Sequence, residues 1–182
     1  MGNQQLNTAV ADKFRYARNK IATAIQTKPI KCLLLGKRNS GKTTIVNVLR
    51  LGCHVRPKPT LEHMYTSVKV NGQVYDFLDL PGEFEMWQEF YATYPEKIIF
   101  CVKVRESEDE IVKMIDTLLE LLSEPMLRDC PVLLLGTHCT AIDKESECAR
   151  LANIVGVDTR IKIACLDSPT EKKLLYKALS QF

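Results

Sequence analysis

The sequence predicts an α/β domain with a mostly parallel, doubly wound sheet of six strands that includes one antiparallel edge strand. Short apolar runs alternate with amphipathic helical segments, which is typical of parallel strands joined by right-handed crossovers. Asn71-Gly72 separates two alternating runs and is a strong hairpin signal, so it accounts for the antiparallel pair. Of the 182 residues, 46% are hydrophobic and 26% charged, so a single globular core is expected.

The first half of the chain contains the hairpin and the first crossover. From residue 7 to 25 apolar side chains recur every three or four positions, which predicts an amphipathic helix that ends before Pro29. A continuous apolar run then predicts a buried strand, and a glycine-bearing turn leads into a helix. Beyond a loop with two prolines come the alternating runs of the hairpin. The expected elements are strand Ile30–Leu35, helix Lys42 to about Leu51, and strands Tyr65–Val70 and Val74–Leu78.

In the second half of the chain, short apolar strands alternate with helices. The strands lack polar alternation, so we expect both of their faces to be buried. The segments between them have helical periodicity. The expected strands are Ile98–Val102, Val132–Leu135 and Ile161–Ala164, and the expected helices are Asp109–Leu122, Ser146–Ile154 and Thr170–Gln181.

Charge divides the chain into two expected regions, a basic helical segment at 1–28 and a nucleotide-binding domain at 29–182. Residues 1–31 contain six basic side chains and one acidic one, although the net charge of the whole chain is only +3. This distribution argues against nucleic-acid binding by the body and for an N-terminal segment that meets an anionic membrane surface. No apolar run approaches the roughly 20 residues that span a bilayer, and no secretory signal is recognisable. The seven cysteines form no C-x-x-C pair, so we expect reduced thiols rather than a zinc site.

The turn after the first strand contains the motif Gly36-Lys37-Arg38-Asn39-Ser40-Gly41-Lys42-Thr43, a full match to G-x-x-x-x-G-K-[ST]. Glycines let the backbone wrap a phosphate, and the N–H groups at a helix N-terminus bind its oxygens. Lys42 would neutralise phosphate charge, and the Thr43 hydroxyl would ligate Mg²⁺. The alternative is a glycine-rich turn without a ligand. The expected phosphate-binding residues are Arg38, Asn39, Ser40, Gly41, Lys42, Thr43 and Thr44.

A second motif, Asp79-Leu80-Pro81-Gly82, ends the strand Val74–Leu78. A carboxylate at the carboxyl end of a strand beside the phosphate loop can bind the water shell of Mg²⁺. The glycine can offer its N–H to a terminal phosphate. Asp-Leu-Pro-Gly is also an ordinary exit from a strand into a turn, so this motif by itself leaves both interpretations open.

With Leu51-Gly52, Pro59-Thr60 and the hairpin at their usual spacing, these motifs resemble the ADP-ribosylation factor (Arf) family of small GTPases, including Arf-like proteins. The resemblance covers nearly the whole chain, with about twelve extra residues before the phosphate loop. It implies a P-loop switch that binds GTP and GDP with Mg²⁺. Thr60 would then close on Mg²⁺ and the terminal phosphate, and Gly82 would be the glycine of the second switch. The hairpin would slide when nucleotide exchange releases the N-terminal helix. Glu83 stands at the family's water-orienting glutamine, which implies slow hydrolysis.

Base recognition departs from the family pattern. The family reads N-K-x-D after the fifth strand, whereas this chain reads Thr137-His138-Cys139-Thr140, without the carboxylate that accepts hydrogen bonds from guanine. His138 could stack on a base, and the Leu166 N–H could reach a base carbonyl; the alternative is that both segments are an ordinary strand end and loop. Two alternatives stay open, a pseudo-GTPase binding module and a P-loop protein with relaxed or ATP specificity. The base-binding candidates are Thr137, His138, Thr140, Cys165 and Leu166.

The N-terminus resembles the lipid-anchored start of the family. Gly2 is a candidate for N-myristoylation, and the basic helix would supply the second membrane signal. The resemblance implies a cytoplasmic monomer that associates reversibly with membranes, in vesicle trafficking or effector recruitment. Its partners would be effectors, an exchange factor and an activating protein. Leu78 stands where the family has Trp, and His63 stands where the family usually has an apolar residue. The resemblance therefore does not predict which partners this chain binds. The alternative is a helix that covers a groove on its own domain.

Overall fold

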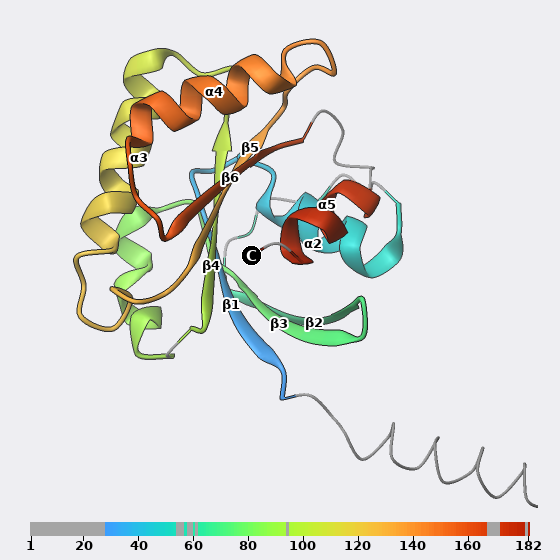
Figure 1. The fold of residues 1–182 in the computed structure, drawn as a ribbon. Coiled ribbons are helices and arrows are strands. Elements are labelled where there is room, and N and C mark those ends of the chain that lie inside the picture. The colour runs from blue at the N-terminus through green and yellow to red at the C-terminus, as the bar shows by residue number, and fades with distance from the viewer. Residues whose placement is uncertain are drawn as a thin grey trace, which may run out of the picture.

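The structure is a computed structural model that describes residues 28–53, 57, 60, 62–93, 95–166, 172–180 and 182. Gly2 and the helix expected at residues 7–25 lie outside these residues. Among the described residues, six strands form one sheet in the order β2-β3-β1-β4-β5-β6 (Figure 1). This sheet confirms the predicted fold class. The strands are β1 (Ile30–Leu35), β2 (Met64–Val70), β3 (Gln73–Asp79), β4 (Lys97–Lys103), β5 (Val132–Thr137) and β6 (Ile161–Cys165).

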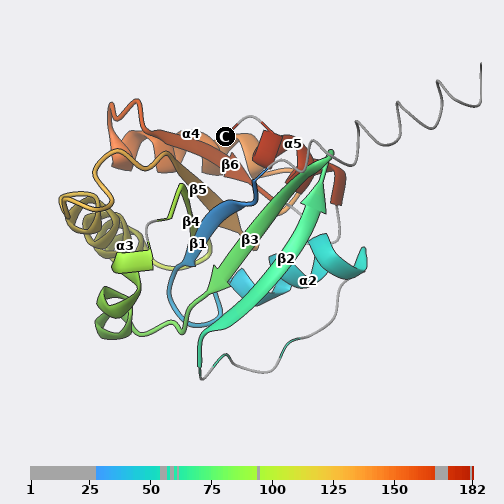
Figure 2. The same ribbon diagram turned by 90° about the horizontal axis from the view of Figure 1, so that it is seen from below.

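The edge strand β2 pairs antiparallel with β3, and the other neighbouring strands pair in parallel. Figure 2 shows β2 and β3 side by side, with α2 (Lys42–Leu51) packed against them. The turn between the two strands has φ angles of 50° at Asn71 and 90° at Gly72. Both angles are positive, as the two-residue turn predicted from Asn-Gly requires.

Helices cover both faces of the sheet (Figure 1). On one face α2 and α5 (Lys172–Ser180) enclose a core to which β1 contributes Cys32 and Leu34. On the other face α3 (Glu108–Leu121) and α4 (Lys144–Val155) enclose a core to which β1 contributes Leu33 and Leu35. Because alternate residues of one strand enter two cores, β1 is apolar throughout, as expected for a parallel strand with both faces buried.

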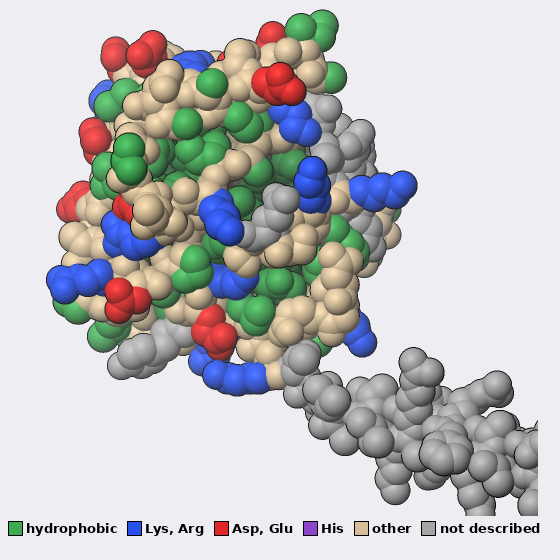
Figure 3. Space-filling view, in the orientation of Figure 1, with side chains coloured by type: hydrophobic (Ala, Val, Ile, Leu, Met, Phe, Trp, Pro, Cys, Tyr) green, Lys and Arg blue, Asp and Glu red, His purple; other side chains and the backbone are tan. Residues whose placement is uncertain are grey.

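The predicted boundaries agree with the structure for Ile30–Leu35 and Lys42–Leu51, and most others shift by one or two residues. The sequence did not predict two short 3₁₀ helices, η1 (Phe84–Met86) and η2 (Gln88–Thr93), which follow the Asp79–Gly82 motif. No helix among the described residues is long and apolar enough to span a membrane. Figure 3 shows acidic and basic side chains on the same face of the described body.

Candidate functional site

The phosphate loop joins β1 to α2 at the carboxyl edge of the sheet. A Cβ at Gly36 would lie 2.3 Å from the Cys101 carbonyl oxygen, so only glycine fits at this crossing with β4. The Ser40 N–H donates to the Lys37 carbonyl oxygen at 3.1 Å and closes the turn. Gly41 precedes α2 and has no side chain to cap its first N–H groups. The loop therefore presents a helix N-terminus suited to an anion.

The Lys42 ammonium is buried in this loop. It donates to the Gly36 carbonyl oxygen at 2.6 Å and to the Lys37 carbonyl oxygen at 3.2 Å. Burial lowers the pKa of Lys42, whereas the nearby Cys101, Asp79 and Glu83 raise it. The loop's own carbonyl groups thus orient the side chain expected to neutralise phosphate charge.

Three oxygen-bearing side chains, Thr43, Thr60 and Asp79, meet beside Lys42. The Thr43 hydroxyl donates to Asp79 Oδ2 at 2.6 Å and lies 2.8 Å from the Thr60 hydroxyl oxygen. Asp79 is fully buried, and its Oδ1 has no hydrogen-bond partner among the described residues. Burial raises the pKa of Asp79, opposed by the Thr43 hydrogen bond and by the charge of Lys42. This set of hard oxygen donors around an unpaired carboxylate oxygen fits Mg²⁺.

The Asp79–Gly82 segment packs directly on the phosphate loop. A Cβ at Gly82 would lie 2.2 Å from the Arg38 nitrogen and 2.6 Å from the Arg38 Cα. Trp87 fixes the other side of the segment, because its buried Nε1–H donates to the Pro81 carbonyl oxygen at 2.8 Å. Glu83 follows with extended backbone and an exposed side chain. The segment expected to sense a terminal phosphate is therefore in contact with the loop expected to bind it.

The other predicted phosphate-binding residues lie on the same loop or at the start of α2. Arg38 and Asn39 are exposed, Thr44 is half-buried and Ser40 is buried. The Ser40 hydroxyl has no hydrogen-bond partner among the described residues.

Thr137, at the end of β5, connects this strand to the phosphate loop. Its hydroxyl donates to the Ser40 carbonyl oxygen at 2.8 Å, and the Val102 carbonyl oxygen lies 3.3 Å away. The neighbouring His138 is exposed, with a φ angle of 61°. The first of the base-binding candidates is thus in contact with the phosphate loop, although sequence reasoning assigned it only to the base.

The other base-binding candidates have protein partners of their own. The Thr140 hydroxyl donates to Asp143 Oδ2 at 2.6 Å, and the Asp143 N–H lies 3.2 Å from the same hydroxyl oxygen. The Leu166 N–H, expected to reach a base carbonyl, donates to the Gly136 carbonyl oxygen at 2.8 Å. In this structure that N–H continues the ladder between β5 and β6, so a base would have to share or displace the Gly136 oxygen.

A cluster of thiols near the end of β5 was not predicted from the sequence. Cys139 and Cys165 are buried and Cys148 is half-buried. Hydrogen bonding with Cys139, burial and hydrogen bonding with Cys148 together raise the pKa of Cys165. These cysteines are far apart in the sequence, so only the packing of α4 on β5 and β6 brings them together.

A cavity of about 520 Å³ lies away from these residues. It is formed by β1, β2 and β3, the end of η2 and Pro95, and its lining contains no residue of the phosphate loop. Its lining includes Lys31, Leu33, Tyr65, Thr66, Asp76 and Leu78. The chemistry of the phosphate loop, rather than cavity size, therefore locates the candidate site.

Comparisons of the sequence and of the fold relate this chain to known proteins. A sequence model described as the ADP-ribosylation factor family matches residues 18–174. The chain is 28% identical over 119 residues to the small COPII coat GTPase SAR1B of Dictyostelium discoideum. It is 30% identical over 124 residues to ADP-ribosylation factor D of the same organism, and 30% identical over 128 residues to ADP-ribosylation factor-like protein 8d of Arabidopsis thaliana.

The aligned regions cover 63%, 65% and 67% of this chain, and 60%, 56% and 72% of the three relatives in the same order. The fold is similar to that of the Arl6 (BBS3) small GTPase of Trypanosoma brucei, whose structure contains the nucleotide analogue GppNp. The TM-score is 0.66 at 17% identity, and the alignment covers 85% of this chain and 95% of that one.

Proposed function

Because the chain belongs to the ADP-ribosylation factor family, we propose that it is a molecular switch that binds GTP and GDP and hydrolyses GTP slowly. The meeting of Thr43, Thr60 and Asp79 beside the Lys42 ammonium carries this proposal. It joins the phosphate loop to one residue from each of the two segments expected to switch. A glycine-rich turn without a ligand would not need an unpaired, buried carboxylate oxygen next to a buried ammonium.

Each residue of the site has a role in this proposal. The N–H groups of the loop and of the start of α2 bind phosphate oxygens, and Lys42 neutralises their charge. Thr43 and Thr60 would ligate Mg²⁺, with Asp79 bound to its water shell, and the ion would neutralise the two terminal phosphates. The Gly82 N–H binds the terminal phosphate. Gly82 lies against the Arg38 backbone, so its segment would be placed to respond to a nucleotide bound by the loop.

The proposal assigns residues 29–182 to the nucleotide domain and residues 1–28 to membrane attachment. Myristoylated Gly2 and the basic helix would together give reversible binding to anionic membranes, where the GTP form recruits effectors in vesicle trafficking. Replacing Lys13, Arg15 and Arg18 by Gln in the full chain is expected to weaken binding to anionic liposomes by about 1 kcal/mol per charge. Co-sedimentation measures the loss. Liposome binding as strong as that of the unchanged chain would contradict a membrane role for residues 1–28.

Two departures from the family pattern, at Thr140 and at Glu83, support a second function. Thr140 has no carboxylate, and its hydroxyl is hydrogen-bonded to Asp143. Glu83 replaces the family's catalytic glutamine. A pseudo-GTPase that binds partners without turnover, or a P-loop protein with relaxed or ATP specificity, would accommodate both departures.

The nucleotide that copurifies with the chain, identified by chromatography after denaturation, tests these functions. We expect guanine nucleotide, and we expect Lys42→Ala to abolish binding. Thr43→Asn is expected to weaken triphosphate binding far more than diphosphate binding, because Thr43 would help to hold the Mg²⁺ ion that neutralises the charge of the terminal phosphates. Titration with fluorescent nucleotides checks both variants. Copurified ATP would favour the relaxed-specificity function, and unchanged affinity in Lys42→Ala would favour a binding module with an empty loop.

A further inference from the structure

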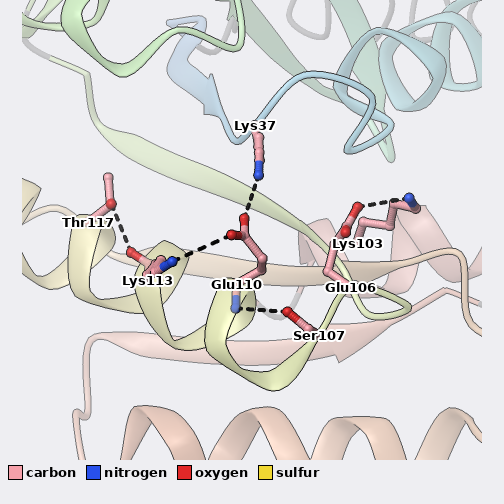
Figure 4. Close-up of polar contacts among 7 residues, drawn as sticks. All are labelled: Lys37, Lys103, Glu106, Ser107, Glu110, Lys113 and Thr117. Atoms are coloured by element: carbon pink, nitrogen blue, oxygen red, sulfur yellow. Dashed lines mark hydrogen bonds and ion pairs between the residues drawn. The ribbon is translucent and has the colours of Figure 1, made fainter.

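An ion pair connects the phosphate loop to helix α3. Lys37 Nζ lies 2.5 Å from Glu110 Oε2, although the two residues are 73 positions apart (Figure 4). The Glu110 N–H donates to the hydroxyl of Ser107, which caps α3, and Lys113 Nζ lies 3.6 Å from Glu110 Oε1. The carboxylate therefore binds one cation from the loop and one from its own helix.

The contact between loop and helix is close. The space between them is only about 20 Å³ and is lined partly by Lys37, Arg38, Glu106 and Glu110. Hydrogen bonding within the pair raises the pKa of Lys37 and lowers the pKa of Glu110. Both groups are accordingly charged at neutral pH. The side chain of Lys37 is 54% exposed and that of Glu110 is 36% exposed.

The same lysine also contacts the phosphate-binding ammonium through its backbone. The Lys37 carbonyl oxygen accepts from Lys42 Nζ at 3.2 Å and from the Ser40 N–H at 3.1 Å. Lys37 is thus bound to α3 by its side chain and to Lys42 by its carbonyl group. A displacement of Lys37 away from α3 would move one of the two carbonyl oxygens that orient the Lys42 ammonium.

We infer that Lys37 and Glu110 are positioning residues for the nucleotide, with their ion pair keeping the loop against α3 and so slowing nucleotide release. This inference rests on the proposed nucleotide binding. An exposed pair has a modest effect, so breaking it is expected to speed release by about two- to fivefold rather than to abolish binding. The alternative role for Lys37, direct attraction of the phosphates, predicts the opposite sign for Glu110: neutralising Glu110 would free Lys37 for the phosphates and slow release.

Dissociation rates of a fluorescent GDP analogue from the full-length chain test the inference. We expect Lys37→Gln and Glu110→Gln each to speed release by about two- to fivefold, and the double variant to be no faster than the faster single variant. Lys37→Arg, which keeps the charge, should retain slow release. Rising salt should speed release from the wild type and have less effect on Glu110→Gln, because salt screens exposed pairs.

The matched control is Glu106→Gln. Glu106 pairs with Lys103 at 2.8 Å on the same surface, but that pair does not involve the phosphate loop (Figure 4). Glu106 acts on Lys37 through its charge but makes no hydrogen bond to it, so release from Glu106→Gln should increase less than release from Glu110→Gln. Wild-type rates in Glu110→Gln, slower release in it, or an equal increase in Glu106→Gln would overturn the inference while leaving nucleotide binding intact. A wild-type chain that binds no guanine nucleotide would instead overturn the proposed function, and this inference with it.

Discussion

Glu83 lies directly after the glycine that contacts the phosphate loop, and its side chain is exposed. A glutamine there accepts a hydrogen bond from the attacking water and donates one toward the phosphate. An ionised glutamate can only accept, and it repels the phosphate. We therefore expect Glu83→Gln to raise single-turnover GTP hydrolysis by about tenfold.

Radiolabelled GTP provides the measurement, and Glu85→Gln is the control because this second exposed carboxylate lies on η1. A wild type that hydrolyses rapidly, with no gain in Glu83→Gln, would make Glu83 itself a working catalytic group.

Thr140 stands at the carboxylate position of the family's base-reading motif. Each charge-assisted hydrogen bond to guanine contributes about 1.5–3 kcal/mol. We therefore expect Thr140→Asp, combined with Thr137→Asn and His138→Lys, to raise the preference for GTP over ATP by at least about tenfold. Asparagine at 137 can still donate to the Ser40 carbonyl oxygen that Thr137 binds, so the phosphate loop should stay in place.

Competition binding measures this preference in the wild type and in the rebuilt chain. Asp143→Ala is the informative companion variant, because the Asp143 carboxylate lies 2.6 Å from the Thr140 hydroxyl. Strong wild-type selectivity that disappears in Asp143→Ala would show that Asp143 already reads the base, and the expected gain would then be absent.

At the scale of elements, η1 is attached to the Asp79–Gly82 segment through Trp87. The indole is buried, and its Nε1–H donates to the Pro81 carbonyl oxygen. Its ring packs edge-on against Phe84 and Phe100, with ring-centroid distances of 5.4 and 6.0 Å. Trp87→Phe keeps an aromatic ring but leaves that carbonyl oxygen unpaired. We expect the free energy of unfolding to fall by about 1–3 kcal/mol.

Urea denaturation followed by circular dichroism measures this loss as a lower transition midpoint at an unchanged slope. Leu119→Ala serves as the comparison, because this exposed side chain on α3 should cost far less. A midpoint in Trp87→Phe equal to that of the wild type would mean that water replaces the indole N–H at Pro81.

At the scale of the whole molecule, the contact between Gly82 and Arg38 connects the sheet's second motif to its first. A methyl group at 82 would collide with loop backbone, which cannot rotate away as a side chain does. We expect Gly82→Ala to force the segment off the loop, to lower the free energy of unfolding by about 1–3 kcal/mol and to change the ratio of triphosphate to diphosphate affinity. Thermal unfolding and nucleotide titration check the two effects. An unchanged free energy of unfolding together with an unchanged affinity ratio would mean that the phosphate loop shifts to accommodate the methyl group.

The sequence predicted those parts of the fold that depend on local patterns. Continuous apolar runs marked β1 and β4, and Asn71-Gly72 marked the turn whose two positive φ angles the structure shows. No element was predicted for residues 84–93, where the structure has η1 and η2, although Phe84, Trp87 and Tyr91 recur at helical spacing of three and four positions. That spacing matches the burial of Trp87 and Tyr91 in the core shared with α3, whereas the division into two short 3₁₀ helices is seen only in the structure.

The candidate site divides in the same way. The motif spacing placed Lys42, Thr43 and Asp79 on one edge of the sheet, as the structure has them. The bond of Thr137 to the loop and the pair between Lys37 and Glu110 depend on how β5 and α3 pack against the loop. Residues so distant in the chain carry no shared sequence signal, so these contacts became visible only in three dimensions.

The tight approach at Gly82 also has a genetic consequence. Every amino acid other than glycine has a Cβ, so each missense change of this codon places an atom against the backbone of Arg38. The φ angle of Gly82 lies outside the left-handed region, so the restriction comes from this neighbour and not from the residue's own backbone. The restriction to glycine therefore applies only while the Asp79–Gly82 segment contacts the phosphate loop. Alleles with a substitution at this codon should therefore act by displacing the Asp79–Gly82 segment from the phosphate loop, whichever residue replaces the glycine.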